Sequence, residues 1–527
     1  MKETDVIIVG LGPTGATLAG LLGQRGLSVT VFDRLPDLFP LPRAAGLDHE
    51  VMRIAQELQV ADRLAAHIAP YRPSEYRGMQ GQLIKRLDAA PPPHRLGWAP
   101  NYVFEQPAFE RILRARLAEL PNVHVATSAE VREVGQDDQH AWADVVLPGD
   151  AEPTRHVARW LIACDGGSSP VRKRLGLTLE DLGFDEPWLV VDAIVSEAKL
   201  AELPQTQVQY CEAERPCTYV VGVGRHRRWE IMLLPGDSLS SDFPDEQLWP
   251  LLERWLKPGE AQIWRAAAYR FHGLVANQWR RDRILLAGDA AHMTPPFMAQ
   301  GMVQGMRDAL NLAWKLDDVH RGRASHRLLD SYQAERRPQV VATTRVAMEL
   351  GRVICERDPE RARERDARLL AEQGGQVSTR FRQDMIPGIA DGLIETATPG
   401  AGSIVPQPLV RDGERFVRLD DVSGRGVRLV AIEALRPDEV RAARQALAPL
   451  GGTLVVLTNE MSADVPADGV PVIHAAEDVP VMAPWLAKLE RRFALVRPDH
   501  CVYGTAASLD EALTLIARLQ QSFQEGF

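Results

Sequence analysis

Short runs of apolar, often β-branched residues alternate with helical patterns in several parts of the chain. Asp5 to Val9 (DVIIV) and Leu27 to Phe32 have the composition of buried parallel strands, and a helical pattern through Arg25 joins them. Trp160 to Cys164 and Ile284 to Ala287 are apolar runs of the same kind, each followed by a turn that contains glycine. This alternation predicts an α/β fold built on a parallel sheet.

Between Trp188 and Leu274 the apolar positions recur every second residue and turns are frequent, as in VVDAIV, TYVVGVG and RWEIMLL. The pattern predicts a mostly antiparallel sheet inserted between parts of the first domain. Laid over a bound cofactor, such a sheet would act as a lid and as a pocket wall. The basic cluster Arg225 to Arg228 is interpreted as a solvated hairpin, with attraction of an acidic substrate as the alternative.

Other segments have weaker patterns. Residues 72–100 are rich in proline and glycine, which predicts irregular or edge-strand structure. Val123 to Thr127, Glu130 to Val134 and Ala141 to Leu147 predict a three-stranded antiparallel piece. Residues 326–373 are charged and helical in pattern, which predicts packing helices with exposed ion pairs.

The C-terminal part is interpreted as a separate domain. A linker rich in Gly and Pro, Pro387 to Pro408, precedes strands and helices that alternate to the end of the chain. The expected domains are residues 1–182 together with 270–385 (nucleotide binding, with a helical extension), 183–269 (the inserted sheet) and 400–527. The last domain contains no CxxC pair, so a stabilising or interaction role is expected instead of a redox role.

Composition excludes several classes of protein. The 527-residue chain has a net charge of −10 and no long basic run, which argues against nucleic acid as the main partner. It contains no apolar stretch of about 18 residues or more, and its MKETD start lacks a signal-peptide pattern, so a cytoplasmic protein without membrane contact is expected. The five cysteines form no CxxC pair, so neither a disulfide framework nor a metal site is predicted.

The first apolar run leads into a dinucleotide fingerprint, Gly10-Leu11-Gly12-Pro13-Thr14-Gly15. In this context the first glycine makes the turn, the second lets a pyrophosphate approach the backbone, and the third lets the helix pack on the strand. Asp33 ends the second strand 18 residues after Gly15, where its carboxylate would bind the ribose hydroxyls of adenosine. Because Asp33 would repel a 2′-phosphate, the sequence favours FAD or NAD over NADP.

Two further turns pair an acid with glycine at a strand end, Asp165-Gly166 and Gly288-Asp289. In each turn the carboxylate would accept hydrogen bonds from hydroxyl groups of a ligand, and backbone N–H groups would lie beside it. The second turn is followed by a Pro-Pro loop and by a helix that begins near Gly301, whose N-terminus suits an anionic cofactor. Arg43 is interpreted as a pyrophosphate ligand or a solvated arginine, and Gln106 as a cofactor contact or a helix cap.

These three motifs, in this order, resemble those of the group A FAD-dependent aromatic monooxygenases, the family of para-hydroxybenzoate and phenol hydroxylases. The phrases GDAAHMTPPFMAQGMVQGMRDALNLAWKL and FALVRPDHCVYG look most like the 3-(3-hydroxyphenyl)propionate hydroxylase branch. The resemblance implies an α/β fold with a Rossmann-like FAD-binding domain, an inserted substrate-binding sheet and a thioredoxin-like C-terminal domain.

The resemblance also implies a set of site residues. The side chain or backbone of each would contact FAD: Gly10, Gly12, Gly15, Asp33, Arg34, Arg43, Gln106, Asp165, Gly166, Gly288, Asp289, Pro296, Gly301 and Met302. The residue that activates a phenol does not stand out; Tyr210, Tyr219 and His292 are candidates, with a place in a pocket wall as the alternative for a tyrosine in a strand.

The activity implied by the resemblance is single-component aromatic hydroxylation. NADH, or NADPH, would reduce FAD, and O2 would then form a C4a-hydroperoxyflavin that hydroxylates a phenol such as 3-(3-hydroxyphenyl)propionate ortho to its hydroxyl. The alternative is the same chemistry on a bulkier phenol, a polyketide or an antibiotic. The expected partners are the small aromatic substrate and O2, without nucleic acid or membrane, and a homodimer is left open.

Competing classes explain less of the sequence. A nicotinamide dehydrogenase would leave Asp165-Gly166 and Gly288-Asp289 without a purpose. A flavin halogenase needs a WxWxIP segment, and a Baeyer–Villiger oxygenase of the two-Rossmann type needs a second GxGxxG; the sequence contains neither. A non-enzymatic FAD-binding protein remains an alternative that an NADH oxidation assay would exclude.

Overall fold

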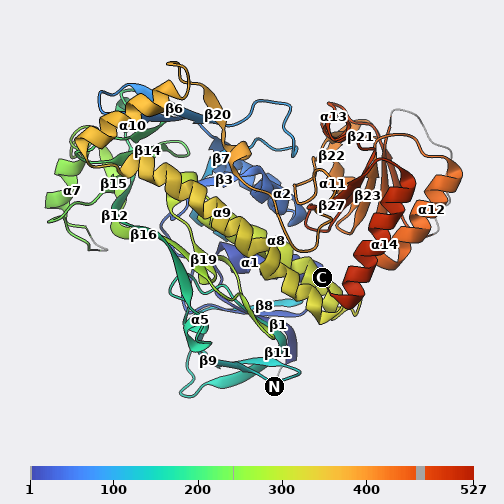
Figure 1. The fold of residues 1–527 in the computed structure, drawn as a ribbon. Coiled ribbons are helices and arrows are strands. Elements are labelled where there is room, and N and C mark those ends of the chain that lie inside the picture. The colour runs from blue at the N-terminus through green and yellow to red at the C-terminus, as the bar shows by residue number, and fades with distance from the viewer. Residues whose placement is uncertain (1–2, 241–242, 459–468, 527) are drawn as a thin grey trace. The chain divides into compact units, whose positions relative to one another are not determined.

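The computed structural model describes residues 3–240, 243–458 and 469–526 (Figure 1). The expected domain bounds include residues 1, 2 and 527, and the MKETD start includes residues 1 and 2. These residues lie outside the described part. The chain divides into two compact units. The first unit consists of Met1–Ala90, Pro100–Arg307 and Val340–Ile386, and the second of Pro91–Ala99, Asp308–Gln339 and Pro387–Phe527.

A mainly parallel sheet forms the base of the first unit. Its strands run in the order β17 (Arg280–Arg281), β18 (Ile284–Leu286), β11 (Thr154–Ala163), β1 (Glu3–Val9), β2 (Val29–Phe32) and β8 (Val123–Ala126). The central strands are parallel to one another and contain fully buried residues such as Ile7, Leu161 and Leu285. The four apolar runs predicted as buried strands are thereby confirmed.

The three-stranded antiparallel piece predicted after residue 123 is wrong in its first strand. β8 pairs in parallel with β2, with Val123 opposite Val29, because its backbone extends the hydrogen-bond ladder of the parallel sheet. The other two strands, β9 (Glu130–Gln136) and β10 (Ala141–Val146), are antiparallel, and β10 pairs with β11.

A second, mostly antiparallel sheet also belongs to the first unit. Its order is β19 (His292–Met293), β16 (Ala261–Ala276), β12 (Leu179–Val195), β15 (His226–Met232), β14 (Cys217–Val221), β13 (Gln207–Tyr210), β5 (Ser74–Arg77), β6 (Leu83–Asp88) and β20 (Thr379–Phe381). The sheet therefore takes β5 and β6 from residues 72–100, where the sequence predicts irregular or edge-strand structure. Tyr76, Ile84 and Leu87 of these strands are buried because they pack in the same core as Trp188.

The second sheet has two different faces, because successive side chains of a strand point in opposite directions. On one face Val191, Tyr219 and Trp229 pack in an apolar core with helix α7 (Asp245–Leu252). On the other face Trp188 and Met232 pack in a core with Phe297 and Met298 of the Pro-Pro loop. We call the second one the loop-side face.

The interpretation of Arg225 to Arg228 as a solvated hairpin is wrong. Arg225 is exposed, but His226, Arg227 and Arg228 are buried. The physical reason is that β15 begins at His226 and lies between β12 and β14 in the interior of the sheet. Sequence periodicity could not show that a buried acid, Asp192 on the neighbouring strand, has hydrogen bonds with His226 and Arg228.

The helices of the first unit connect these sheets. They include α1 (Pro13–Gln24), α2 (His49–Glu57), α4 (Gln106–Ala118), α5 (Pro170–Arg174) and α10 (Pro359–Ala371). Two long helices, α8 (Gly301–His320) and α9 (Asp330–Cys355), contribute residues to both units. Within the part of the chain that the structure describes, none of the helices has the length and apolar character needed to cross a bilayer.

The second unit contains its own sheet, in the order β25 (Val472–Ala475), β24 (Thr453–Leu457), β23 (Arg428–Ala431), β26 (Phe493–Val496) and β27 (Val502–Ala506). The first three strands are parallel to one another, β26 is antiparallel to β23, and β27 is antiparallel to β26. Helices α12 (Pro437–Leu447) and α14 (Leu509–Glu525) pack together on this sheet (Figure 1). The mixed α/β fold is as expected, and the thioredoxin-like assignment stays a prediction.

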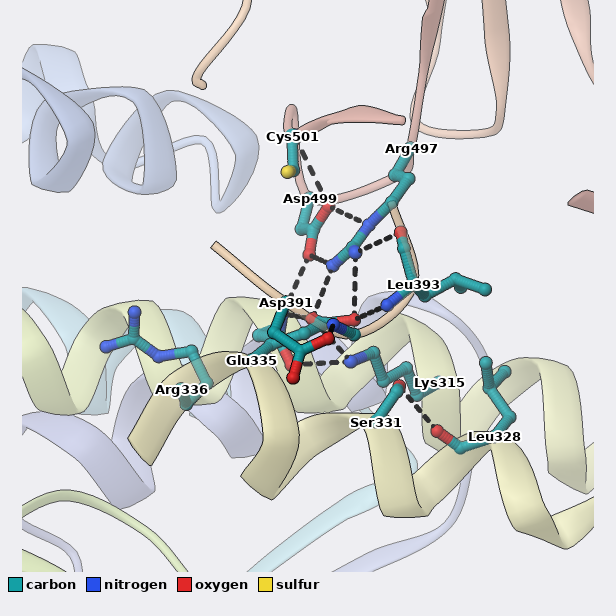
Figure 2. A network of polar contacts seen from close by, with 12 residues as sticks. Lys315, Leu328, Ser331, Glu335, Arg336, Asp391, Leu393, Arg497, Asp499 and Cys501 are labelled. Carbon is teal, nitrogen blue, oxygen red and sulfur yellow. Dashed lines mark hydrogen bonds and ion pairs between the residues drawn. The ribbon is translucent and has the colours of Figure 1, made fainter. Parts of the chain in front are cut away.

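A buried cluster of charges lies inside the second unit (Figure 2). Glu335 of α9 accepts hydrogen bonds from Lys315 of α8 at 2.7 Å and from both terminal nitrogens of Arg497, at 2.9 and 2.7 Å. Asp499 completes the cluster by accepting from Arg497 and from Asn311. Lys315, Glu335 and Arg497 have no solvent-exposed surface, so each charge depends on its partners.

Candidate active site

The predicted motifs all follow the carboxyl ends of neighbouring parallel strands. Gly10 to Gly15 follow β1, Asp33 follows β2, Asp165-Gly166 follow β11, and Gly288-Asp289 follow β18. Because these strands are adjacent and parallel, their carboxyl ends meet at one edge of the sheet, where open α/β sheets bind their ligands. The structure therefore brings the three motifs together.

The glycines of the first motif differ in what surrounds them. A Cβ atom on Gly10 would lie 2.3 Å from the carbonyl oxygen of Cys164, and one on Gly15 would lie 2.0 Å from the carbonyl oxygen of Gly10. Gly10 also has a φ of +103°. A Cβ on Gly12, by contrast, would meet nothing within 4 Å. Gly10 and Gly15 thus allow the protein to pack, and Gly12 faces open space at the start of α1.

Thr14 joins the first motif to the Gly288-Asp289 turn. A Cβ on Gly288 would lie 2.5 Å from the Thr14 hydroxyl oxygen, and one on Gly305 would lie 2.2 Å from it. Both the turn and the first part of α8 therefore pack directly on the start of α1. Asp289 itself is exposed at this junction.

Asp165 has a carboxylate that the protein satisfies only in part. Its Oδ2 accepts a hydrogen bond from the backbone N–H of Val171 at 3.1 Å, whereas its Oδ1 is buried without a hydrogen-bond partner. Burial raises the pKa of Asp165 above its ordinary value. The adjacent Gly166 has open space where a Cβ would stand. An acceptor without a donor beside open space is the arrangement that a ligand hydroxyl would complete.

Arg172 links the two acid–glycine turns, and sequence reasoning missed it. Its guanidinium donates to the carbonyl oxygens of Ala290 at 2.8 Å and of Gly167 at 2.7 Å. The side chain is buried although it lies in the basic run Val171-Arg172-Lys173-Arg174, whose other two cations are exposed. No periodic signal distinguishes it from these neighbours.

Asp33 lies at the edge of the same region. Its carboxylate accepts from the backbone N–H of Leu11 at 2.6 Å and of Leu35 at 2.8 Å, which holds it beside the first glycine turn. Arg34 follows it and is exposed.

Gln106 holds the backbone of the segment that contains Arg43. Its side-chain oxygen accepts from the N–H groups of Arg43 at 2.9 Å and Ala44 at 2.6 Å, and its amide nitrogen donates to Glu110. The Arg43 guanidinium is exposed and lies 4.5 Å from the centre of the Phe39 ring. Gln106 thus positions the backbone of residues 43 and 44.

The Pro-Pro loop is held by several contacts before α8 begins at Gly301. Its 3-10 turn, η3 (Pro296–Met298), ends at Ala299, which has a left-handed backbone with φ of 53°. Arg382 donates to the carbonyl oxygen of Met298 at 2.7 Å. A non-glycine residue in this conformation is unfavourable by about 1–3 kcal/mol and persists where the surroundings enforce it. Met302 lies in the first turn of α8 and is half-buried.

Aromatic side chains of the loop-side face cover the turn η3. The ring of Phe297 lies 5.7 Å from that of Trp188 and 6.0 Å from that of Phe271, in both cases edge to face. This packing brings the second sheet over the loop.

Asp192 organises the charges on the same face. It accepts from His226 at 2.7 Å, from Arg228 at 2.7 Å and from Arg265 at 2.9 Å. Burial alone would raise the pKa of Asp192, but the charges of Arg228 and Arg265 and the hydrogen bond with His226 hold it below its ordinary value. Arg228 also donates to the carbonyl oxygens of Pro42 and Arg43. The sheet is thereby tied to the segment beside the nucleotide motifs.

The catalytic candidates from the sequence lie elsewhere. Tyr210 and Tyr219 belong to the core on the α7 side of the second sheet, where Trp255 donates to the Tyr210 hydroxyl at 3.3 Å. His292 is fully buried with its ring 5.3 Å from that of Trp279. The structure therefore does not bring either tyrosine to the loop-side face.

Comparison with known proteins agrees with this geometry. Residues 3–347 match the family described as FAD binding domain, and residues 402–522 match the HcaD C-terminal domain. A probable NADH-specific resorcinol 4-hydroxylase of Rhodococcus jostii (strain RHA1) is 37% identical over 98% of this chain and 95% of its own. A 3-(3-hydroxy-phenyl)propionate/3-hydroxycinnamic acid hydroxylase of Burkholderia vietnamiensis (strain G4 / LMG 22486) is 32% identical over 95% of this chain and 93% of its own.

Solved structures share the fold over nearly the whole chain. The flavin-dependent monooxygenase PieE, in complex with FAD and substrate, aligns with a TM-score of 0.78 over 99% of both chains at 21% identity. Aklavinone-11 hydroxylase, with FAD and aklavinone, aligns with a TM-score of 0.74 over 98% of this chain and 99% of its own at 22% identity.

Proposed function

Because this chain belongs to the family of FAD-dependent aromatic hydroxylases, we propose that it hydroxylates a phenol ortho to its hydroxyl group with NADH and O2. The net reaction would convert one phenol, NADH, O2 and a proton into the dihydroxylated ring, NAD⁺ and water. The observation that carries the proposal is the meeting of Gly12, Asp165-Gly166 and Gly288-Asp289 at one sheet edge.

The residues present fit FAD. The open space at Gly12 would admit the pyrophosphate, and the unpartnered Oδ1 of Asp165 and the exposed Asp289 would accept hydrogen bonds from cofactor hydroxyls. Asp33 would bind the adenosine ribose. Three glycines would act by letting the backbone pack closely: Gly10, Gly15 and Gly288. The remaining expected contacts of FAD are Arg34, Arg43, Gln106, Pro296, Gly301 and Met302.

FAD, when bound, accepts a hydride from the nicotinamide and activates O2. The chain's own residues would prepare the site for that chemistry. The N-terminus of α8 would stabilise negative charge near Gly301 through its unpaired N–H groups. The apolar side chains of Trp188, Phe271 and Phe297 would exclude water from the reacting centre.

The substrate class can be narrowed by the names of two relatives. Resorcinol and 3-(3-hydroxyphenyl)propionate, which those names contain, are both phenols with a second substituent meta to the hydroxyl. We therefore propose a meta-substituted phenol for this chain. A bulkier phenol, a polyketide or an antibiotic is the alternative outcome of the same assay.

The test is NADH oxidation by the purified holoprotein over a panel that contains both phenols and one polycyclic phenol. We expect at least one phenol to stimulate NADH oxidation and to yield a product heavier by one oxygen atom, with NADH at least as effective as NADPH. The flavin should leave the polypeptide on acid precipitation, because no covalent attachment is expected. Absence of an oxygenated product with every phenol would contradict the proposal.

A second measurement examines substrate gating. We propose that one flavin meets NADH near the surface and O2 in a closed site, so we expect the substrate to accelerate flavin reduction. Stopped-flow reduction of the bound flavin, with and without the accepted phenol, measures this. Equal rates would show that the reduction step is not gated.

A further inference from the structure

Glu230 occupies the middle of the loop-side face. On β15 it lies two residues from Met232, which packs in the core with Phe297, and two residues from Arg228, which binds the backbone of Pro42 and Arg43. Side chains two apart on a strand point to the same side. Glu230 is therefore placed between the Pro-Pro loop and the segment that Gln106 holds beside the nucleotide motifs.

The carboxylate of Glu230 accepts no hydrogen bond from the part of the chain that the structure describes. Among the described residues its one ion pair is with Arg228, at 3.8 Å between Nη1 and Oε1, although only 6% of Glu230 is exposed. Asp192, one pair further along the sheet, has hydrogen bonds with three side chains, His226, Arg228 and Arg265. The two buried acids on this face thus differ: the carboxylate of Asp192 has its hydrogen-bond partners, whereas that of Glu230 can still accept hydrogen bonds.

The neighbouring polar groups cannot fill this capacity as they are arranged. Thr218 stands directly opposite Glu230 on β14, but its hydroxyl donates to the side-chain oxygen of Gln209 at 2.6 Å. Gln209 in turn donates to the Ser74 hydroxyl at 3.3 Å. The neighbour on the other side is Val190 of β12, which is apolar. A donor for Glu230 must therefore come from water or from a ligand that replaces it.

The charges around Glu230 suit a proton acceptor. Burial raises the pKa of Glu230, Arg228 and Arg265 oppose that shift, and Asp192 adds to it. His226 is bound to Asp192, and Arg43, on the facing segment, is exposed. A raised carboxyl pKa is closer to that of a phenol, which makes proton transfer less unfavourable, and the adjacent guanidinium stabilises negative charge that remains near the pair.

We propose that Glu230 is the catalytic residue that activates the phenol: it accepts the hydrogen bond of the substrate hydroxyl and removes its proton. In this step the phenol O–H bond breaks, its electron pair stays on the phenol oxygen, and the proton forms a new O–H bond on a carboxylate oxygen of Glu230. The resulting phenolate is the electron-rich ring that ortho hydroxylation requires. This assignment rests on the proposed function.

The test compares wild type with Glu230→Gln and with Tyr219→Phe. Glu230→Gln retains the size of the side chain and removes its ability to accept a proton. Tyr219→Phe is the matched control, because it removes a polar group from the opposite face of the adjacent strand. The FAD content of each variant shows whether the site is folded. The phenol is the one that wild type oxidises best, together with a fluorinated analogue whose hydroxyl is more acidic.

The rate of formation of hydroxylated product, and the product formed per NADH consumed, are measured at several pH values. We expect Glu230→Gln to bind FAD normally and to form product about 10²-fold more slowly, within the range for loss of a general base. The loss should shrink as the pH approaches the pKa of the phenol, and it should be smaller with the fluorinated analogue. Tyr219→Phe should match wild type in rate and pH profile.

Three results would overturn the assignment. Glu230→Gln could form product at the wild-type rate, or it could be slow to the same degree at every pH and with both phenols, as a purely structural role predicts. Glu230→Asp shortens the reach of the carboxylate. An unchanged pH profile in this variant would also contradict the assignment of Glu230 as the proton acceptor. If wild type itself hydroxylates no phenol, the proposed function fails and the assignment falls with it.

Discussion

At the scale of single residues, the carboxylates near the motifs fall into two groups according to whether protein donors satisfy their oxygens. Asp192 has hydrogen bonds with His226 and two arginines, whereas Asp165 retains a buried oxygen without a partner and Glu230 accepts no hydrogen bond from the described residues. Leaving a buried acceptor unsatisfied is unfavourable by about 1–3 kcal/mol, so such groups are expected where a ligand supplies the missing donor. Asp165 would serve the cofactor and Glu230 the substrate.

The glycine turn gives a prediction at the same scale. Gly12→Ala should leave the unfolding free energy of the apoprotein within about 0.5 kcal/mol of wild type, because a Cβ there meets nothing within 4 Å and φ is −71°. FAD affinity should nevertheless fall, since the methyl group would stand where the pyrophosphate approaches. Flavin titration of the apoprotein and thermal unfolding separate the two effects.

Gly15→Ala is the contrasting change three residues later. Its Cβ would lie 2.0 Å from the carbonyl oxygen of Gly10, so the apoprotein should lose about 1–3 kcal/mol from overpacking, before any cofactor binds. Equal losses of apoprotein stability in both variants would show that Gly12 does not face open space.

Elements of the second unit are joined by charges that periodic patterns do not reveal. Helices α8 and α9 and the turn after β26 meet at Lys315, Glu335 and Arg497, as Figure 2 shows. Leu393 also contributes, since its N–H donates to Glu335 and its carbonyl oxygen accepts from Arg497. Because all three charged side chains are inaccessible to water, removal of one leaves the others uncompensated.

Glu335→Gln should therefore destabilise the second unit by about 3–5 kcal/mol. Hydrogen exchange of peptides from β26 and β27 measures local opening in a chain whose two units need not unfold together. Arg518→Gln is the control, because it breaks an ion pair of the exposed Arg518 with Glu395 in the same unit and should leave the opening free energy nearly unchanged.

The same cluster should make the second unit sensitive to acid. Burial alone would raise the pKa of Glu335, but Arg497 and Lys315 hold it at about 2, below its ordinary value of 4.5. A depressed carboxyl pKa contributes stability that is present above pH of about 4.5 and is lost as the pH falls towards about 2, by roughly 3 kcal/mol in total. In Glu335→Gln this acid-dependent part should be missing, and an unchanged pH dependence would contradict the assignment.

For the whole molecule, the C-terminal residues are not an independent appendage. The second unit contains residues 308–339 of α8 and α9 as well as residues 387–527, and the charge cluster joins the two segments. A chain that ends at residue 399 would therefore leave Lys315 and Glu335 without Arg497.

We expect this truncated chain to lose protection from hydrogen exchange over residues 308–339 and to have a lower soluble yield. Full-length Arg497→Met separates loss of the cluster from loss of the domain, because it removes the guanidinium alone. Wild-type protection of residues 308–339 in the truncated chain would show that these segments fold without the C-terminal residues.

The sequence alone determined the features that depend on neighbours along the chain. The apolar runs at β1, β11 and β18, the glycine turn at Gly10 to Gly15 and the helix start at Gly301 are local patterns, and the structure confirms each. The family and its cofactor followed from the order of these local motifs, which requires no knowledge of long-range contacts.

Only the tertiary structure decided which polar side chains meet. Arg228 was interpreted as solvated because four polar residues in a row indicate a surface hairpin, and Asp192, 36 residues away, is what permits its burial. Glu335 and Arg497 are 162 residues apart, and no periodicity relates them. Hydrophobic patterns record the face on which a residue lies, but the partner of a buried charge depends on which strands and helices become neighbours. For that reason Arg172, Glu230 and Glu335 could be recognised only after the chain was folded.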